Sequence, residues 1–172
     1  MKKKIIQATE PVEIRLNKFI ANAGICSRRD ADQLILSGKV TVNDQVVQVL
    51  GTKIMPTDKI TYLKKIIQSE KLQYVLLNKP KDFITTTQDP QNRRTVMTLI
   101  EKACVERIYP VGRLDRHTTG LLLFTNDGDL AKRLTHPKYK IKKIYQLEID
   151  KPIIEAHYNE ITAGVHLEDG LA

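Results

Sequence analysis

The chain has 172 residues, of which 41% are hydrophobic and 28% are charged, and its formal net charge is +8 at pH 7. This length holds one medium domain, or a small domain and a larger one, and the hydrophobic fraction is too high for a wholly disordered protein. A globular protein this basic most often binds a polyanion, of which nucleic acid is the commonest, although a solvated basic surface gives the same charge.

Several classes of protein are not indicated by the sequence. The two cysteines, Cys26 and Cys104, have neither metal-ligand spacing nor the pattern of a disulfide framework, which favours a reducing setting. The four histidines lack zinc-site spacing, and there is no phosphate-binding P-loop or dinucleotide fingerprint. Residues 1–6 start like a signal peptide, but no apolar stretch of sufficient length follows, and no run approaches transmembrane length. We therefore expect a soluble, cytoplasmic protein with no membrane partner and no metal.

The first third of the chain predicts a small module of two helices and a small sheet. Residues 1–12 form a basic tail that we expect to be poorly ordered. Apolar spacing over 16–23 predicts a helix that Gly24 ends, and Ser27 predicts the N-cap of a second helix that ends at Gly38. The hydrophobic period then becomes two, which predicts a hairpin over 40–49 and a further strand over 59–63.

The second helix begins with Arg28 and Arg29. A helix N-terminus carries partial positive charge, so two arginines there are unfavourable unless an anion binds, and the free backbone amides add donors for a phosphate. The alternative is that both side chains extend into water. Their proximity in sequence to Arg15, Lys18 and Lys39 favours phosphate binding.

Three stretches, in the same order and spacing, resemble the S4-type RNA-binding domain. They are RLNKFI at 15–20, GICSRRDAD at 24–32 and GKVTVN at 38–43. The resemblance implies that residues 13–62 form a module whose helices and hairpin hold structured RNA. The RNA-binding candidates in it are Arg15, Lys18, Arg28, Arg29, Lys39 and Asn43.

Residues 63–72 are polar and predict a linker, after which a second set of elements begins. A strand over 74–77 runs into Asn78-Lys79-Pro80, and a short helix follows over 95–101. The apolar run 121–124, bounded by turn residues, predicts a strand buried on both faces. Asn126 or Asp127 caps a helix that ends at His136-Pro137.

The last thirty residues predict three more elements. Residues 143–150 alternate as a strand with Tyr145 on one face, and a helix runs from near Pro152 to Ile161. Residues 164–170 read as a strand entering an Asp-Gly turn. Because the sequence stops where a partner strand would begin, we expect a truncated chain.

A short polar loop ahead of the 121–124 strand carries Arg113 and Asp115. An aspartate with an ordinary pKa of about 3.9 is ionised at neutral pH and can act as nucleophile or base without tuning. The alternatives are a structural Arg113–Asp115 ion pair or a loop cap that uses Thr118. Local chemistry supports the catalytic and the structural interpretation equally.

The motifs around this loop resemble the signature of bacterial ribosomal RNA pseudouridine synthases. The stretch GRLD at 112–115 is followed by GLLL at 120–123 and TNDG at 125–128, while LNKP at 77–80 and KIY at 143–145 resemble an earlier and a later motif of that family. The resemblance implies an α+β protein, in which the S4-type module precedes a catalytic domain at 73–172 with a mixed, mainly antiparallel sheet. The C-terminal part of that domain would be missing, and the full-length protein would be a monomer.

The resemblance also implies a mechanism and site residues. Asp115 would be the nucleophile that detaches uracil from its ribose, after which the base rotates and rejoins through carbon. Tyr145 would stack near the target base and help to remove its C5 proton, and Arg113 would hold the flipped-out nucleotide or orient Asp115. Lys79 is a further RNA-binding candidate. Neither a metal nor an organic cofactor is implied.

The expected function is therefore site-specific conversion of uridine to pseudouridine in ribosomal RNA, with large-subunit RNA favoured over small-subunit RNA. One alternative is a non-catalytic RNA-binding or ribosome-assembly protein, because the expected catalytic domain is incomplete. A weaker alternative is a phosphodiesterase that uses Asp115 and Asp127, but no ligand spacing supports a metal pair.

Overall fold

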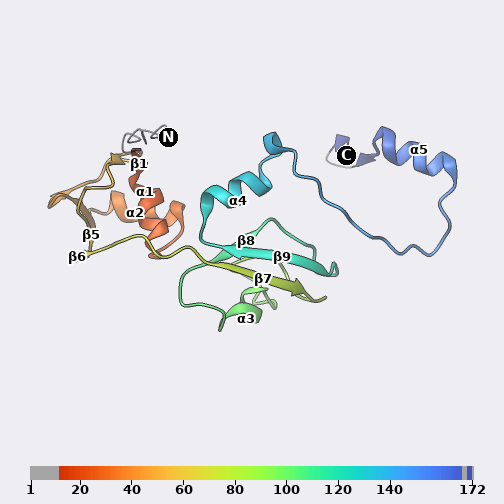
Figure 1. Cartoon of the computed structure of the whole chain (residues 1–172), viewed down its shortest axis with the longest axis horizontal. Coiled ribbons are helices and arrows are strands. Elements are labelled where there is room, and N and C mark those ends of the chain that lie inside the picture. Colours follow the sequence, from red (N-terminus) through yellow and green to blue (C-terminus); the bar gives the residue numbers. More distant parts are fainter. Residues whose placement is uncertain (1–11, 168–169, 172) are drawn as a thin grey trace, which may run out of the picture. The chain divides into compact units, whose positions relative to one another are not determined.

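The computed structural model describes residues 12–167 and 170–171. The described residues divide into two compact units, the first ending at Tyr139 and the second starting at Lys140. Figure 1 labels many of their helices and strands. The basic tail expected over 1–12 lies outside the described residues except for Val12. The helices and antiparallel sheets occupy separate segments of the chain, which confirms the α+β class.

The first unit contains the two expected helices, α1 (Leu16–Asn22) and α2 (Arg28–Leu36). Gly24 follows α1 with a φ of +73°, a left-handed conformation that glycine adopts without strain. The Ser27 hydroxyl accepts a hydrogen bond from the Asp30 backbone N–H at 3.2 Å and donates one to the Asp30 carboxylate at 2.7 Å. The side-chain cap predicted from the sequence is therefore confirmed.

A four-stranded antiparallel sheet follows these helices in the chain. Its spatial order is β3 (Gln45–Val46), β2 (Val40–Val42), β5 (Ile60–Tyr62) and β6 (Lys65–Ile66). A separate antiparallel pair joins β1 (Ile14–Arg15) to β4 (Lys53–Ile54). The hairpin turn has φ values of +50° at Asn43 and +65° at Asp44, as a two-residue type I′ turn requires. Strand β6 lies within the segment 63–72 that was expected to be a linker.

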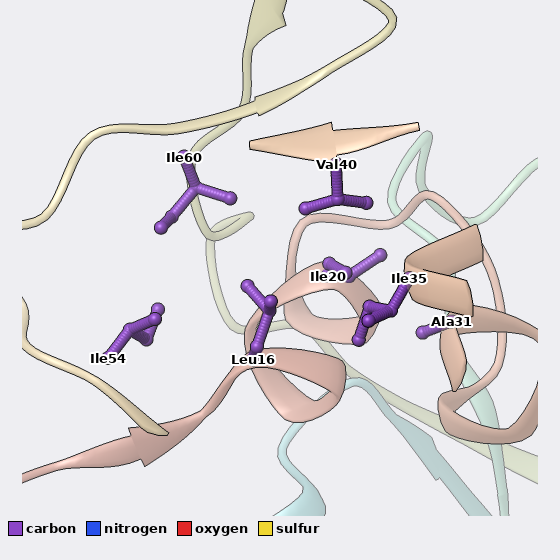
Figure 2. Packing of buried hydrophobic residues seen from close by; sticks show 7 residues of the cluster. All are labelled: Leu16, Ile20, Ala31, Ile35, Val40, Ile54 and Ile60. Atoms are coloured by element: carbon purple, nitrogen blue, oxygen red, sulfur yellow. The ribbon is translucent and has the colours of Figure 1, made fainter. Parts of the chain in front are cut away.

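The helices and strands of this module share one apolar core. Figure 2 shows its buried side chains gathered between α1, α2 and the strands. At most 3% of any of these side chains is exposed. The cluster comprises Leu16, Ile20, Ala31, Ile35, Val40, Ile54 and Ile60.

A second sheet lies further along the same unit. Its antiparallel strands have the order β7 (Tyr74–Lys79), β9 (Gly120–Thr125) and β8 (Tyr109–Val111), so that strands distant in sequence are neighbours. Helix α3 (Met97–Ile100) lies beside this sheet in Figure 1. The second buried cluster joins the helix region to β9 and comprises Val96, Ile100, Ile108, Leu122 and Phe124.

Strand β9 corrects one expectation from the sequence. Its continuous apolar run was expected to be buried on both faces, but Leu121 is 72% exposed, whereas Leu122 is 3% exposed and Phe124 is fully buried. Successive side chains of a strand point to opposite faces of the sheet, and only the face with Leu122 and Phe124 packs in the second cluster.

Helix α4 (Gly128–Thr135) follows β9 directly. Its N-cap is Asp127, whose Oδ1 accepts hydrogen bonds from the backbone N–H groups of Leu130 at 2.9 Å and Asp129 at 3.1 Å. These bonds help to keep the Asp127 pKa below its ordinary value. The helix ends at His136, before the short 3₁₀ helix η1 (Pro137–Tyr139). Both predicted ends of this helix are thus confirmed.

The second unit contains helix α5 (Glu155–Ala163) and a short antiparallel pair, β10 (His166–Leu167) with β11 (Gly170–Leu171). The expectation that a partner strand is missing after 164–170 was wrong for this pair, although residues 168–169 of its turn lie outside the described residues. The strand expected over 143–150 was also wrong, since these residues adopt neither helix nor strand. A strand needs the backbone of a neighbour, and no described residue pairs with this segment.

An acidic side chain in the loop before α3 allows a pH prediction. Asp89 accepts two hydrogen bonds from the Arg93 guanidinium, at 2.7 and 3.1 Å, and these hold its pKa at about 2. Because its pKa is lower in the folded state, this aspartate stabilises the fold above its ordinary pKa, and the contribution disappears as the pH falls towards 2. We expect Asp89→Asn to be less stable than the unsubstituted protein at neutral pH.

The difference in the free energy of unfolding between the two proteins should become smaller below about pH 4, where the aspartate of the unfolded chain gains its proton. Urea unfolding at a series of acidic pH values measures it. A difference between the two proteins that stays constant down to pH 2 would contradict the prediction.

Candidate active site

The loop that joins β8 to β9, residues 112–119, carries Asp115 with its side chain exposed. The loop enters through Gly112, whose φ of +80° strains any residue with a Cβ, and leaves at Gly120, the first residue of β9. It therefore projects from the end of a central strand whose alternate side chains are buried in the second cluster.

Lys79, at the end of β7, binds the backbone of this loop through its side chain. Its side chain is fully buried, and its ammonium donates to backbone carbonyl oxygens of the loop, Thr118 at 2.9 Å, Asp115 at 3.0 Å and Arg116 at 3.3 Å. A fourth bond goes to the Pro80 carbonyl at 3.0 Å. Burial lowers the pKa of Lys79, because removal from water disfavours the charged form. The carbonyl dipoles around the ammonium offset that cost.

The position of Lys79 corrects the expectation that it contacts RNA. A phosphate cannot reach an ammonium that is 0% exposed and already surrounded by four carbonyl oxygens. Lysine is almost never fully buried unless its charge is compensated, and here the compensation comes from backbone 36 to 39 residues further along the chain, apart from Pro80. The ammonium of Lys79 thus binds the backbone of the Asp115 loop.

Two further residues hold the same loop. The buried Thr85 hydroxyl donates to the Leu114 carbonyl at 2.7 Å and accepts from the Leu114 N–H at 3.2 Å, one residue before Asp115. The Asp82 backbone N–H donates to the Arg116 carbonyl at 2.8 Å, and the Asp82 carboxylate lies 3.3 Å from the Arg116 guanidinium. Backbone on both sides of Asp115 is consequently held.

The carboxylate of Asp115 contrasts with its anchored backbone. Its carbonyl oxygen accepts hydrogen bonds from Lys79 and from the Thr118 N–H at 3.1 Å, whereas its carboxylate has no hydrogen-bond partner within 12–167 and 170–171. Among the described residues Asp115 forms no ion pair, with Arg113 or with any other residue. The structural alternative of an Arg113–Asp115 pair is thus not present. A fixed backbone with an exposed, unengaged carboxylate suits a group that acts on a ligand.

The other two expected catalytic residues are both exposed. Arg113 lies on the same loop, two residues before Asp115. Tyr145 lies in the second unit, in the segment without helix or strand, and is 57% exposed. Their roles remain predictions.

The RNA-binding candidates of the N-terminal module are mostly free to meet a ligand. Arg15, Arg28, Arg29 and Lys39 are exposed. Arg28 donates a long hydrogen bond of 3.4 Å to the Asn17 side chain, and the others take part in no ion pair within the described part of the chain.

Two candidates already have partners. The Asn43 side chain donates to the Asp58 carboxylate at 2.9 Å and accepts from the Lys59 N–H at 3.0 Å, so its amide serves the hairpin turn. The Lys18 ammonium lies 2.8 and 2.9 Å from the two carboxylate oxygens of Asp129, at the start of α4. A phosphate that binds Lys18 must compete with this carboxylate.

We therefore expect Asp129→Asn to strengthen RNA binding by Lys18. An exposed ion pair is worth about 0–1 kcal/mol, so the dissociation constant should fall by up to about fivefold. The released ammonium should also steepen the dependence of log K on log salt by up to about 0.9. Fluorescence anisotropy with an RNA hairpin measures both quantities.

The matched control is Asp44→Asn, which frees Lys59 from a similar pair of 2.9 Å in the hairpin of the N-terminal module. Equal changes in the two variants would show a general effect of net charge and contradict a role for Lys18.

Sequence reasoning missed Thr85 and Asp82 and assigned Lys79 the wrong role. Thr85 lies in a run of three threonines, and nothing in that run distinguishes the one whose hydroxyl is buried. Asp82 has a φ of +69°, which follows from the turn after β7 rather than from a motif. The sequence feature that could have drawn attention to Lys79 is its position directly before a proline at the end of an apolar strand.

Among the described residues, no group of three or more His, Cys, Asp or Glu side chains is placed to hold a metal ion. None of the helices in the described part of the chain combines the length and apolar character needed to cross a membrane.

Comparison with known proteins agrees with this architecture. Residues 73–167 match the model of the RNA pseudouridylate synthase family, and residues 14–60 match the S4 domain. An uncharacterized RNA pseudouridine synthase of Aquifex aeolicus is 42% identical over 163 residues, which cover 94% of this chain and 65% of that protein. The ribosomal large subunit pseudouridine synthase B of Bacillus subtilis is 44% identical, over 91% of this chain and 64% of its own length.

A solved structure shows the same relationship. The crystal structure of a pseudouridylate synthase matches with a TM-score of 0.55 and 29% identity, over 91% of this chain and 67% of that one. The present chain thus spans somewhat less than two thirds of the two curated relatives above. By sequence and by fold, the chain belongs to the RNA pseudouridylate synthase family and carries an S4 domain before the family's characteristic region.

Proposed function

We propose that this protein converts a specific uridine of ribosomal RNA, in the large subunit, to pseudouridine. The family match and the similarity to the ribosomal large subunit pseudouridine synthase B of Bacillus subtilis support this substrate class. The observation that carries the proposal is the Asp115 loop, whose backbone is hydrogen-bonded to Lys79 and Thr85, while the Asp115 carboxylate is exposed and has no ion-pair partner among the residues described.

The chemistry requires few groups. The N1–C1′ bond of uridine breaks and a C5–C1′ bond forms, while C5 loses a proton and N1 gains one, so the reaction needs neither an oxidant nor a reductant. Asp115 is the nucleophile that assists detachment of the base. Tyr145 stacks near the base and assists removal of the C5 proton, and Arg113 holds the flipped-out nucleotide or orients Asp115.

The target nucleotide must leave its stack to meet an aspartate on a protein loop. Extruding a base costs a few kcal/mol, and least where the RNA is already unpaired. A loop or a partly unstacked site in folded RNA is therefore the proposed substrate. The S4 domain supplies phosphate contacts that are largely independent of base sequence.

We also propose the organisation of the chain that follows from this function. Residues 13–62 bind RNA and residues 73–172 carry out catalysis. Of the segment 63–72 that was expected to connect them, β6 pairs with β5 in the sheet of the RNA-binding module, so the residues after β6 form the connection. The protein acts in the cytoplasm, and its full-length form is a monomer.

The test is to incubate the protein with an unmodified transcript of large-subunit ribosomal RNA and to map pseudouridines by chemical labelling. We expect one new pseudouridine at a defined loop position. Tight, salt-dependent binding without any pseudouridine would instead support the alternative of a non-catalytic RNA-binding or ribosome-assembly protein.

A further inference from the structure

The C-terminal end of α4 and the following 3₁₀ helix form a strongly basic corner in the first unit. We call Lys132, Arg133 and Lys138 the α4 corner; all three are exposed. The segment 132–139 contains no aspartate or glutamate, and none of the three cations has an ion-pair partner within the described part of the chain. Such an uncompensated cluster attracts anions.

This corner borders the Asp115 loop. The point where a Cβ of Gly112 would lie is 4.0 Å from the Cγ2 atom of Thr135, the last residue of α4. The Thr135 hydroxyl donates to the Ala131 carbonyl at 2.8 Å, within the helix. Gly112 opens the loop, and Asp115 follows three residues later, so the end of the helix and the base of the loop are packed neighbours.

Contacts with aromatic rings place Lys138 within the corner. Its ammonium lies 4.7 Å from the centre of the Tyr139 ring, and its backbone N–H donates to His136 Nδ1 at 3.2 Å. The His136 and Tyr139 rings meet edge to face with their centres 6.4 Å apart. Because an ammonium above an aromatic face loses part of its freedom, this cation is partly fixed before any ligand arrives.

Helix stability explains only part of this charge. Lys132 and Arg133 lie in the last turn of α4, where cations interact favourably with the helix dipole, and Arg133 also lowers the pKa of Asp127. Lys138 lies beyond the helix and has neither role. The corner thus carries more positive charge than the helix requires.

We infer that the α4 corner binds the phosphates of the RNA strand beside the nucleotide that reaches Asp115. The inference rests on the proposed function, since it takes the Asp115 loop as the place where RNA is engaged. Phosphates are the anions that an RNA ligand presents in a row, and two or three cations beside the loop would hold the backbone while one base leaves the stack.

The experiment compares two double variants with equal loss of charge. Lys132→Gln with Lys138→Gln removes two cations of the corner, whereas Lys102→Gln with Lys151→Gln removes two exposed lysines elsewhere in the chain. Glutamine keeps a long polar side chain with good helix propensity, so α4 should be retained. Binding to a fluorescent RNA hairpin with a uridine in its loop is measured over a series of potassium chloride concentrations.

The logarithm of the association constant falls linearly with the logarithm of the salt concentration, and each phosphate contact contributes about 0.7 to 0.9 to the steepness of that line. We therefore expect the line to be less steep by about 1.4 to 1.8 in the corner variant. The control variant should keep its slope. Equal slopes in the two double variants, whether changed or unchanged, would overturn the inference. Circular dichroism on both variants shows that the fold is intact.

A third variant tests the position of the Lys138 ammonium without changing the net charge. Tyr139→Leu leaves every cation but removes the ring under Lys138, and should weaken binding by about twofold, whereas Tyr139→Phe should not. If the unsubstituted protein forms no pseudouridine in the transcript but the corner and control variants still differ in salt dependence, the proposed function is wrong and the α4 corner remains an RNA-binding surface. If pseudouridine forms while the slopes are equal, the surface alone fails.

Discussion

Asp115→Asn is expected to abolish pseudouridine formation and to leave RNA binding and stability unchanged. Asparagine has the same shape as aspartate but no carboxylate, and loss of a nucleophile typically lowers catalysis by about 10³-fold or more. The side chain of Asp115 is exposed and forms no ion pair with any residue that the structure describes. Its replacement should therefore change the free energy of unfolding by no more than about 0.5 kcal/mol.

Three measurements on the same preparation test this expectation: pseudouridine in the transcript, affinity for the RNA hairpin, and the urea unfolding midpoint. Asp44→Asn is the control, because it removes the same charge from the hairpin of the N-terminal module. Undiminished pseudouridine formation by Asp115→Asn would show that another group is the nucleophile. A parallel loss of affinity would show that the carboxylate has a role in binding the RNA.

Local features of this fold could be predicted because their causes are local. The caps at Ser27 and Asp127 each depend on one short side chain and backbone within three residues of it. The turn at Asn43-Asp44 depends on residue types that tolerate positive φ. Amphipathic spacing identified α1, and its side chains do meet in the core of Figure 2.

The contacts of Lys79 and Thr85 with the Asp115 loop could not be predicted, because the residues that they join are distant in sequence. Lysine is normally exposed, so a sequence gives no reason to bury Lys79 unless the carbonyl groups of residues 115–118 are known to converge on it. The same holds for Thr85, whose partner Leu114 lies 29 residues away. The motif identified the nucleophile candidate but not the groups that hold its loop.

The strand expected over 143–150 failed for a related reason. Alternation of apolar and polar residues says which side chains would share a face, whereas a strand exists only through hydrogen bonds to a neighbouring backbone. No described residue supplies such a neighbour for Tyr145 and the residues around it. Pattern alone could not distinguish this segment from β7, whose register with β9 is continuous over six residue pairs.

Lys79→Met is expected to lower the free energy of unfolding by about 2–4 kcal/mol and to reduce catalysis with it. Two of the four carbonyls have other backbone donors, since Thr118 N–H reaches Asp115 and Asp82 N–H reaches Arg116. The carbonyls of Pro80 and Thr118 would each lose the ammonium. Each lost hydrogen bond to a charged donor costs about 1.5–3 kcal/mol, and the sum is partly offset because no charge is then buried.

Urea unfolding of Lys79→Met against Lys81→Met, which replaces an exposed lysine two residues away, isolates the buried ammonium. The control should stay within about 0.5 kcal/mol of the unsubstituted protein. Without urea, the folded molecules of Lys79→Met lack the ammonium that binds the loop carbonyls, and Asp115 should be held less firmly in place. Catalysis should then fall by more than the folded fraction explains, because a displacement of about 1 Å at a reacting group can cost about 10²-fold. Activity that follows the folded fraction alone would mean that Lys79 stabilises the fold without positioning Asp115.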